Sequence, residues 1–89
     1  MRIKEGYLLR KIADTNIVVP VGERVIDFRG MMVLNDVSAK VWEFLNVDRT
    51  RNQVLDYILE TYDVDRETAL YDINELIEKM ENNGVLELC

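Results

Sequence analysis

The hydrophobic pattern of this chain changes its period at Asn35. Before this residue, short apolar runs alternate with glycine and turn-forming residues, a pattern typical of strands. After it, apolar residues recur every three or four positions, as in amphipathic helices. A block of strands followed by a block of helices predicts an α+β fold, with a sheet on one side and helices on the other. At 89 residues, the chain is long enough for a single domain, residues 1–89.

The first part of the chain predicts three or four strands of a small antiparallel meander. A turn is expected at Asp14, Thr15 and Asn16, because these residue types favour turns. Pro20 has no N–H to give to a ladder, so it is expected at a sheet edge or at the end of a strand. The predicted strands are residues 7–13, 17–21, 25–28 and 31–34.

The second part predicts three helices with recognisable ends. Asn35 or Asp36 is expected to cap the first helix, which has Trp42 beside its apolar stripe as a core residue. Thr50 and Gln53 fit a capping box at the start of the second helix. Asp65 is expected to cap the third helix.

The third helix is expected to end near Asn83, with Gly84 in the left-handed conformation that favours glycine. The apolar tail at 85–88 is expected to pack back onto the body of the domain. The apolar arc of the third helix comprises Ala69, Leu70, Ile73, Leu76, Ile77 and Met80, with Asp72 and Lys79 on its flank and Tyr71, Glu75 and Glu78 opposite.

Composition argues against an enzyme or a metalloprotein. The chain has no histidine, the commonest general base and metal ligand, and its one cysteine is Cys89. A single thiol forms neither an internal disulfide nor a zinc site, so we expect no catalytic residues, no metal and no cofactor. No apolar run spans a bilayer and the N-terminus is no secretory signal, which predicts a cytoplasmic protein without membrane partners.

Three helices beside a sheet also fit a winged-helix protein that binds DNA or regulates transcription. Such a domain places its last helix in the major groove. Residues 66–83 carry two basic and five acidic side chains, a net charge of −3, and the whole chain carries −6. Phosphate backbones would repel such a surface, so nucleic acid is not expected as a partner.

A peptide is the remaining candidate partner. An exposed sheet edge can accept another chain as an added strand. If residues 31–34 form such an edge, Met31 and Met32 could adapt to different guests, although the pattern alone favours their filling gaps in the core of the sheet. The edge could instead pair with another protein in a structural complex, or with a second copy, so both monomer and homodimer stay open.

The order of these segments is similar to that of the PqqD-like proteins, also called RiPP recognition elements. These are small peptide chaperones of pyrroloquinoline quinone biosynthesis and related pathways. The similarity spans Tyr7 to Leu88, and its segments are VLNDVSAKVWEFL at 33–45, TRNQVLDYILETY at 50–62 and ALYDINELIEKMENNGVLEL at 69–88. Where many relatives have a glycine before the second helix, this chain has Asp48 and Arg49.

The resemblance implies a three-stranded sheet followed by three helices, in a winged helix-turn-helix-like arrangement. It implies that the leader of a precursor peptide adds as a strand beside the third strand, against the third helix. The domain then presents the peptide to a modifying enzyme, often a radical SAM protein. Carried onto this chain, the resemblance assigns peptide contacts to Met32, Val33, Leu34, Leu70, Ile73, Leu76 and Ile77, with Asp72 and Lys79 as polar rims. The acidic flank of the third helix suggests in addition a basic residue in the leader, which would set register more than affinity.

Overall fold

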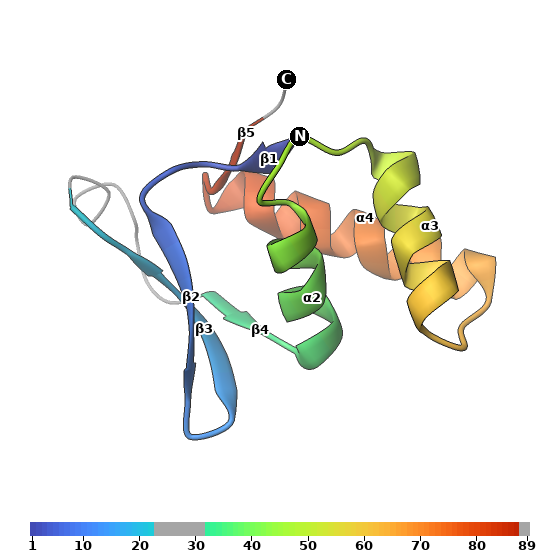
Figure 1. Cartoon of the computed structure of the whole chain (residues 1–89), viewed down its shortest axis with the longest axis horizontal. Coiled ribbons are helices and arrows are strands. Elements are labelled where there is room, and N and C mark those ends of the chain that lie inside the picture. The colour runs from blue at the N-terminus through green and yellow to red at the C-terminus, as the bar shows by residue number, and fades with distance from the viewer. Residues whose placement is uncertain (23–31, 88–89) are drawn as a thin grey trace.

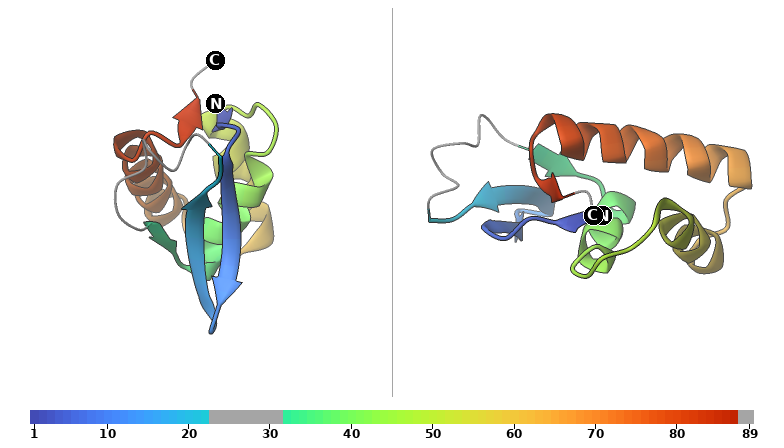
Figure 2. Two further views of the ribbon diagram at one scale, coloured as in Figure 1. Left: turned by 90° about the vertical axis from the view of Figure 1, so that its left-hand side faces the viewer. Right: turned by 90° about the horizontal axis from the view of Figure 1, so that it is seen from above.

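A computed structural model of the chain describes residues 1–22 and 32–87. A three-stranded antiparallel sheet, in the order β2-β3-β4, is followed by three helices, as predicted. Figures 1 and 2 show the sheet on one side of the molecule and α4 along the far side of α2 and α3. The elements are β1 (Arg2–Ile3), β2 (Tyr7–Ile12), β3 (Thr15–Pro20), β4 (Met32–Leu34), α2 (Asp36–Phe44), α3 (Arg51–Thr61), α4 (Arg66–Asn82) and β5 (Leu86–Glu87).

The hairpin between β2 and β3 turns one residue earlier than the sequence predicts. Ala13 and Asp14 form a two-residue loop with φ of 50° and 66°, and the Ile12–Thr15 pair closes it. Positive φ at both loop residues matches the right-handed twist of the flanking strands. Thr15 and Asn16, predicted as turn residues, therefore belong to β3. Pro20 ends this strand, as expected.

Strand β4 pairs with β3 along one edge, through Asn16–Leu34, Ile17–Val33 and Val18–Met32. Among residues 1–22 and 32–87, no strand pairs with its other edge. The predicted strand at 25–28 and Met31, which the sequence placed at the start of β4, lie outside the described residues.

The end of the chain returns to its beginning, a pairing that the sequence did not predict. Strand β5 pairs antiparallel with β1, with Ile3 opposite Leu86 and Arg2 opposite Glu87. The Arg2 Nε lies 3.1 Å from Glu87 Oε2, and the Lys4 amide donates to the Val85 carbonyl at 2.9 Å. The predicted tail at 85–88 thus packs on the body through Val85 and β5, while Leu88 lies outside the described residues.

The helix ends follow the predicted capping residues. Asn35 accepts from the Ser38 amide at 2.8 Å, which makes it the N-cap of α2. Thr50 and Gln53 form the capping box of α3, with bonds of 3.1 and 2.8 Å. Gly84 follows α4 with φ of 70°, the left-handed conformation that glycine adopts without strain.

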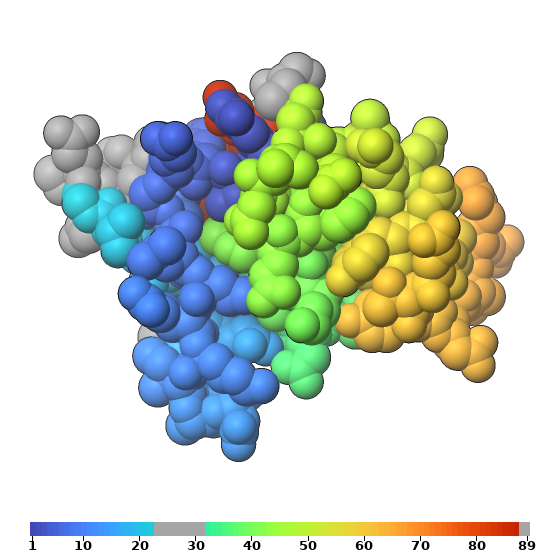
Figure 3. Space-filling view, viewed as in Figure 1, coloured from blue at the N-terminus to red at the C-terminus, as the bar shows by residue number. Residues whose placement is uncertain are grey.

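The core lies between the inner face of the sheet and the three helices. Figure 3 shows α2 and α3 beside β2 and β3 on one face of the molecule, where they cover most of α4. Trp42 is buried, as predicted. Leu70, which was predicted to belong to the buried apolar arc of the third helix, lies at the edge of that arc and is 37 % exposed. The core residues with the least exposure are Val18, Met32, Val41, Leu45, Val54, Ile77, Met80 and Val85.

Within the described residues, no helix is long and apolar enough to span a membrane.

The N-cap of α4 gives a prediction on pH. The Asp65 carboxylate accepts from the Thr68 hydroxyl at 2.7 Å and from the Thr68 amide at 3.0 Å, and these bonds lower the pKa of Asp65 below its ordinary 3.8. A lowered pKa in the folded state stabilises the fold above the unfolded pKa, and this contribution is lost as pH falls through the folded value. Asparagine caps helices as well as aspartate does but does not titrate.

We therefore expect wild type to melt at a higher temperature than Asp65→Asn at a pH of about 6, and this difference to shrink towards a pH of about 2.5. Thermal melts followed by circular dichroism measure both proteins. A difference that stays constant across this range would show that the ionised carboxylate contributes nothing beyond the cap itself.

Candidate functional site

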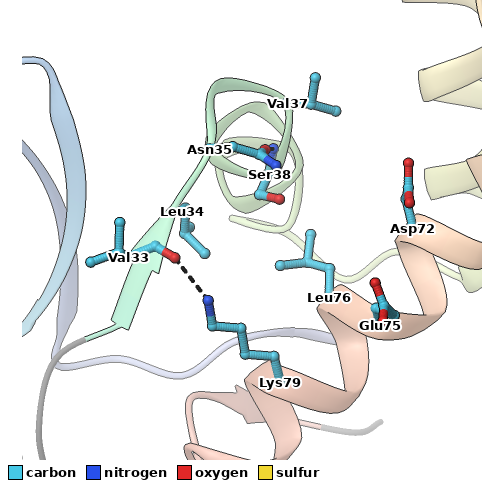
Figure 4. A pocket seen from close by; sticks show the side chains of 9 residues that line it. All are labelled: Val33, Leu34, Asn35, Val37, Ser38, Asp72, Glu75, Leu76 and Lys79. Carbon is cyan, nitrogen blue, oxygen red and sulfur yellow. Dashed lines mark hydrogen bonds between the residues drawn. The ribbon is translucent and has the colours of Figure 1, made fainter.

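A groove lies between β4, the start of α2 and the middle of α4 (Figure 4). Its volume is about 340 Å³ and it is open to solvent. Strand β4 forms one wall with the edge that pairs with no other described strand, and α4 forms the opposite wall. We call it the β4–α4 groove, lined by Val33, Leu34, Asn35, Val37, Ser38, Asp72, Glu75, Leu76 and Lys79.

The strand wall presents backbone groups to the groove. The Val33 carbonyl points away from β3 and accepts from the Lys79 ammonium at 2.9 Å (Figure 4). Because the N–H and C=O of one strand residue point to the same edge in an antiparallel pair, we expect the Val33 N–H to face the groove too. Val33 is 44 % exposed, whereas Met32 is 1 % exposed, so β4 packs one face on the core and leaves the other face partly in solvent.

A buried polar residue fixes the junction between β4 and α2. The Asn16 side chain is 8 % exposed, and its Nδ2 donates to the Leu34 carbonyl at 3.2 Å and to Asp36 Oδ1 at 3.0 Å. Buried polar groups that have all their partners hold a structure in one arrangement. Asn16 therefore ties the end of the strand wall to the first turn of α2.

A second, apolar hollow of about 130 Å³ adjoins the groove between α2, α3 and the start of α4. Val37, Ser38, Asp72 and Leu76 line both spaces, so the groove leads into this hollow. The other residues around the hollow are Val41, Ile58, Tyr62, Val64, Ala69 and Ile73. An extended chain in the groove could place an apolar side chain here.

The helix wall carries charges of both signs. Asp72 and Glu75 lie towards the N-terminal end of α4, and Lys79 lies towards the strand wall. The Tyr71 hydroxyl donates to Glu75 Oε1 at 3.1 Å, and this bond raises the pKa of Tyr71 above its ordinary 10.0. The groove is therefore acidic at one end and basic at the other.

The structure distributes the residues assigned to peptide contacts over three environments. Val33, Leu34, Asp72, Leu76 and Lys79 line the β4–α4 groove. Ile73 lines the adjoining hollow. Met32 and Ile77 are buried in the core, and Leu70 is exposed and lines neither space.

The sequence assignment missed Asn35, Val37, Ser38 and Glu75, which also line the groove. Val37 had a detectable signal, because it is an apolar residue in the first turn of a helix on the same stripe as Val41. Glu75 was expected on the side of the helix opposite the apolar arc, and the structure places it on the groove wall. In the part of the chain that the structure describes, no three metal-ligating side chains cluster.

Comparisons with known proteins identify similar folds and a family. A structure of TbiB1 in complex with the TbiA(beta) leader peptide superposes with a TM-score of 0.75 and 22 % sequence identity, over 98 % of this chain and 95 % of that chain. A lasso peptide synthetase B1 complexed with its leader peptide gives 0.70 and 20 %, over 94 % of this chain and 93 % of that chain. None of the curated proteins matches the sequence. The family model of coenzyme PQQ synthesis protein D (PqqD) matches residues 22–86, nearly three quarters of the sequence, and the chain therefore belongs to the PqqD family.

Proposed function

We propose that this protein is a non-catalytic peptide chaperone. It binds the leader of a ribosomally made precursor peptide as a strand added to the open edge of β4, and it delivers the precursor to a modifying enzyme. The observation that carries this proposal is the edge of β4 that no strand within residues 1–22 and 32–87 pairs with, and whose backbone faces a groove walled by α4. Backbone pairing along such an edge supplies affinity, and flanking pockets select side chains.

The similar folds support this proposal, because TbiB1 and the lasso peptide synthetase B1 were both solved with a leader peptide. We further propose that the modifying enzyme is a radical SAM protein, as in the pathways that PqqD-like proteins serve. Ribosomally made precursors arise in the cytoplasm, where we place this activity.

The charge of α4 weighs against the alternative of duplex binding. The helix carries Arg66 and Lys79 against five carboxylates, a net charge of −3. Lys79 is held against the Val33 carbonyl rather than projecting freely from the helix. Counterion release cannot drive the binding of an acidic helix to phosphates.

An NMR titration tests the proposal with a synthetic leader peptide, taken from a short reading frame beside the gene of this protein. We expect amide shifts at Met32–Leu34, at Val37 and Ser38, and along 72–79, because these residues line the groove or lie on its strand. Shifts confined to the loop around Asp48, or shifts only with duplex DNA, would contradict it. A scrambled leader of the same composition is the control.

A further inference from the structure

Lys79 occupies the backbone acceptor that an added strand would use. Its ammonium lies 2.9 Å from the Val33 carbonyl, on the edge of β4 that faces the groove (Figure 4). A guest strand on this edge needs that carbonyl for one of its own N–H groups. Peptide binding as proposed above therefore requires the ammonium to leave the carbonyl, and the present inference rests on that proposal.

Lys79 forms no ion pair with a carboxylate among the residues that the structure describes. Within residues 1–22 and 32–87, the ion pairs join Met1 to Asp48, Arg2 to Glu87 and Lys40 to Glu43, and none includes Lys79. Glu75, one turn earlier on the same helix, accepts from the Tyr71 hydroxyl through one of its two carboxylate oxygens. A guest backbone over the groove excludes water from Lys79, and a charge that loses water without a partner destabilises the complex.

We propose that Lys79 acts as a latch, by which we mean that its ammonium occupies the Val33 carbonyl until a guest strand displaces it. We further propose that Lys79 thereby selects guests that carry an acidic residue. The guest strand displaces the ammonium from the Val33 carbonyl. An aspartate or glutamate of the guest, on the side of the strand that faces α4, then receives it. A guest without this carboxylate has to break the same contact and offers nothing in exchange.

The acidic side chain of Glu75, further along α4, sets the register in which the guest strand can bind. Lys79 lies four positions after Glu75 on the helix, roughly 6 Å along the axis. This distance equals about two residues of a strand, the repeat that returns a side chain to the same face. A guest that slips by two residues towards the acidic end therefore moves its carboxylate from Lys79 to Glu75, where like charges repel.

Selection from a displayed library of random twelve-residue peptides tests this inference. The baits are wild type, Lys79→Glu and, as a matched charge reversal outside the groove, Lys40→Glu, whose side chain is 57 % exposed on α2. Peptides that also bind Val33→Pro, which lacks the edge N–H, are discarded. We expect wild type and Lys40→Glu to enrich an acidic residue at one position, and Lys79→Glu to enrich lysine or arginine there.

A double-mutant cycle with the peptide that binds wild type most tightly distinguishes a latch from an ion pair that only adds affinity. Replacing its acidic residue by glutamine should weaken binding to wild type about 5- to 10-fold. The glutamine peptide should bind Lys79→Met at least as tightly as it binds wild type, because no latch remains to be displaced. Weaker binding to Lys79→Met would overturn the latch. Groove-dependent peptides without an acidic preference would overturn the selection by Lys79 and leave the proposed function standing, whereas the lack of any groove-dependent peptide would overturn both.

Discussion

Val33→Pro is expected to weaken leader binding at least 10-fold while the domain stays folded. The Val33 carbonyl points into the groove, so its N–H is expected on the same edge and outside the ladder with β3. Proline removes this N–H from the backbone and is tolerated on edge strands whose N–H faces solvent. The guest then loses a backbone hydrogen bond and meets the proline ring where its own backbone should lie. Isothermal titration calorimetry measures the affinity.

The matched control is Val33→Thr, which keeps the N–H and a β-branched side chain at the same exposed position. It should bind the leader as wild type does. Circular dichroism melts of both variants establish that the β3–β4 ladder survives. Wild-type affinity in a folded Val33→Pro protein would mean that the leader does not pair with the edge of β4 at this residue.

Local signals predicted the fold well because capping chemistry depends on neighbours in the sequence. Asn35, the capping box at Thr50 and Gln53, and Asp65 mark the starts of all three described helices, and Gly84 follows the last one. The hairpin turn was misplaced because Asp14, Thr15 and Asn16 all favour turns. Strand register, which decides which residues pair, is set by the sheet as a whole rather than by three residues.

Non-local features were beyond the sequence pattern. The β1–β5 pair joins residues 2–3 to 86–87, and nothing in either segment indicates its partner. Periodicity identified one apolar face on α4 but could not say what covers it. Along that face, Ile77 is buried by the core, Leu76 reaches the groove and Leu70 stays partly in water.

This division of α4 gives the second large effect. The resemblance to PqqD-like proteins assigned Ile77 and Leu70 alike to the peptide groove, yet Ile77 is 2 % exposed and Leu70 is 37 % exposed. Truncating a buried isoleucine to alanine leaves a cavity and costs about 2–5 kcal/mol of unfolding free energy. For a domain of this size, each kcal/mol lowers the melting temperature by about 4–8 °C. We therefore expect Ile77→Ala to melt roughly 8–40 °C below wild type.

Leu70→Ala is the matched control, because it makes a similar truncation on the same helix at a partly exposed position. Leu70→Ala should lower the free energy of unfolding by less than about 1 kcal/mol, since alanine favours the helix and little packing is lost. At a temperature where Ile77→Ala is still folded, its affinity for the leader should match that of wild type, because the side chain does not line the groove. Equal melting temperatures for the two variants would contradict this packing of α4, and a loss of affinity in folded Ile77→Ala would return this residue to the binding site.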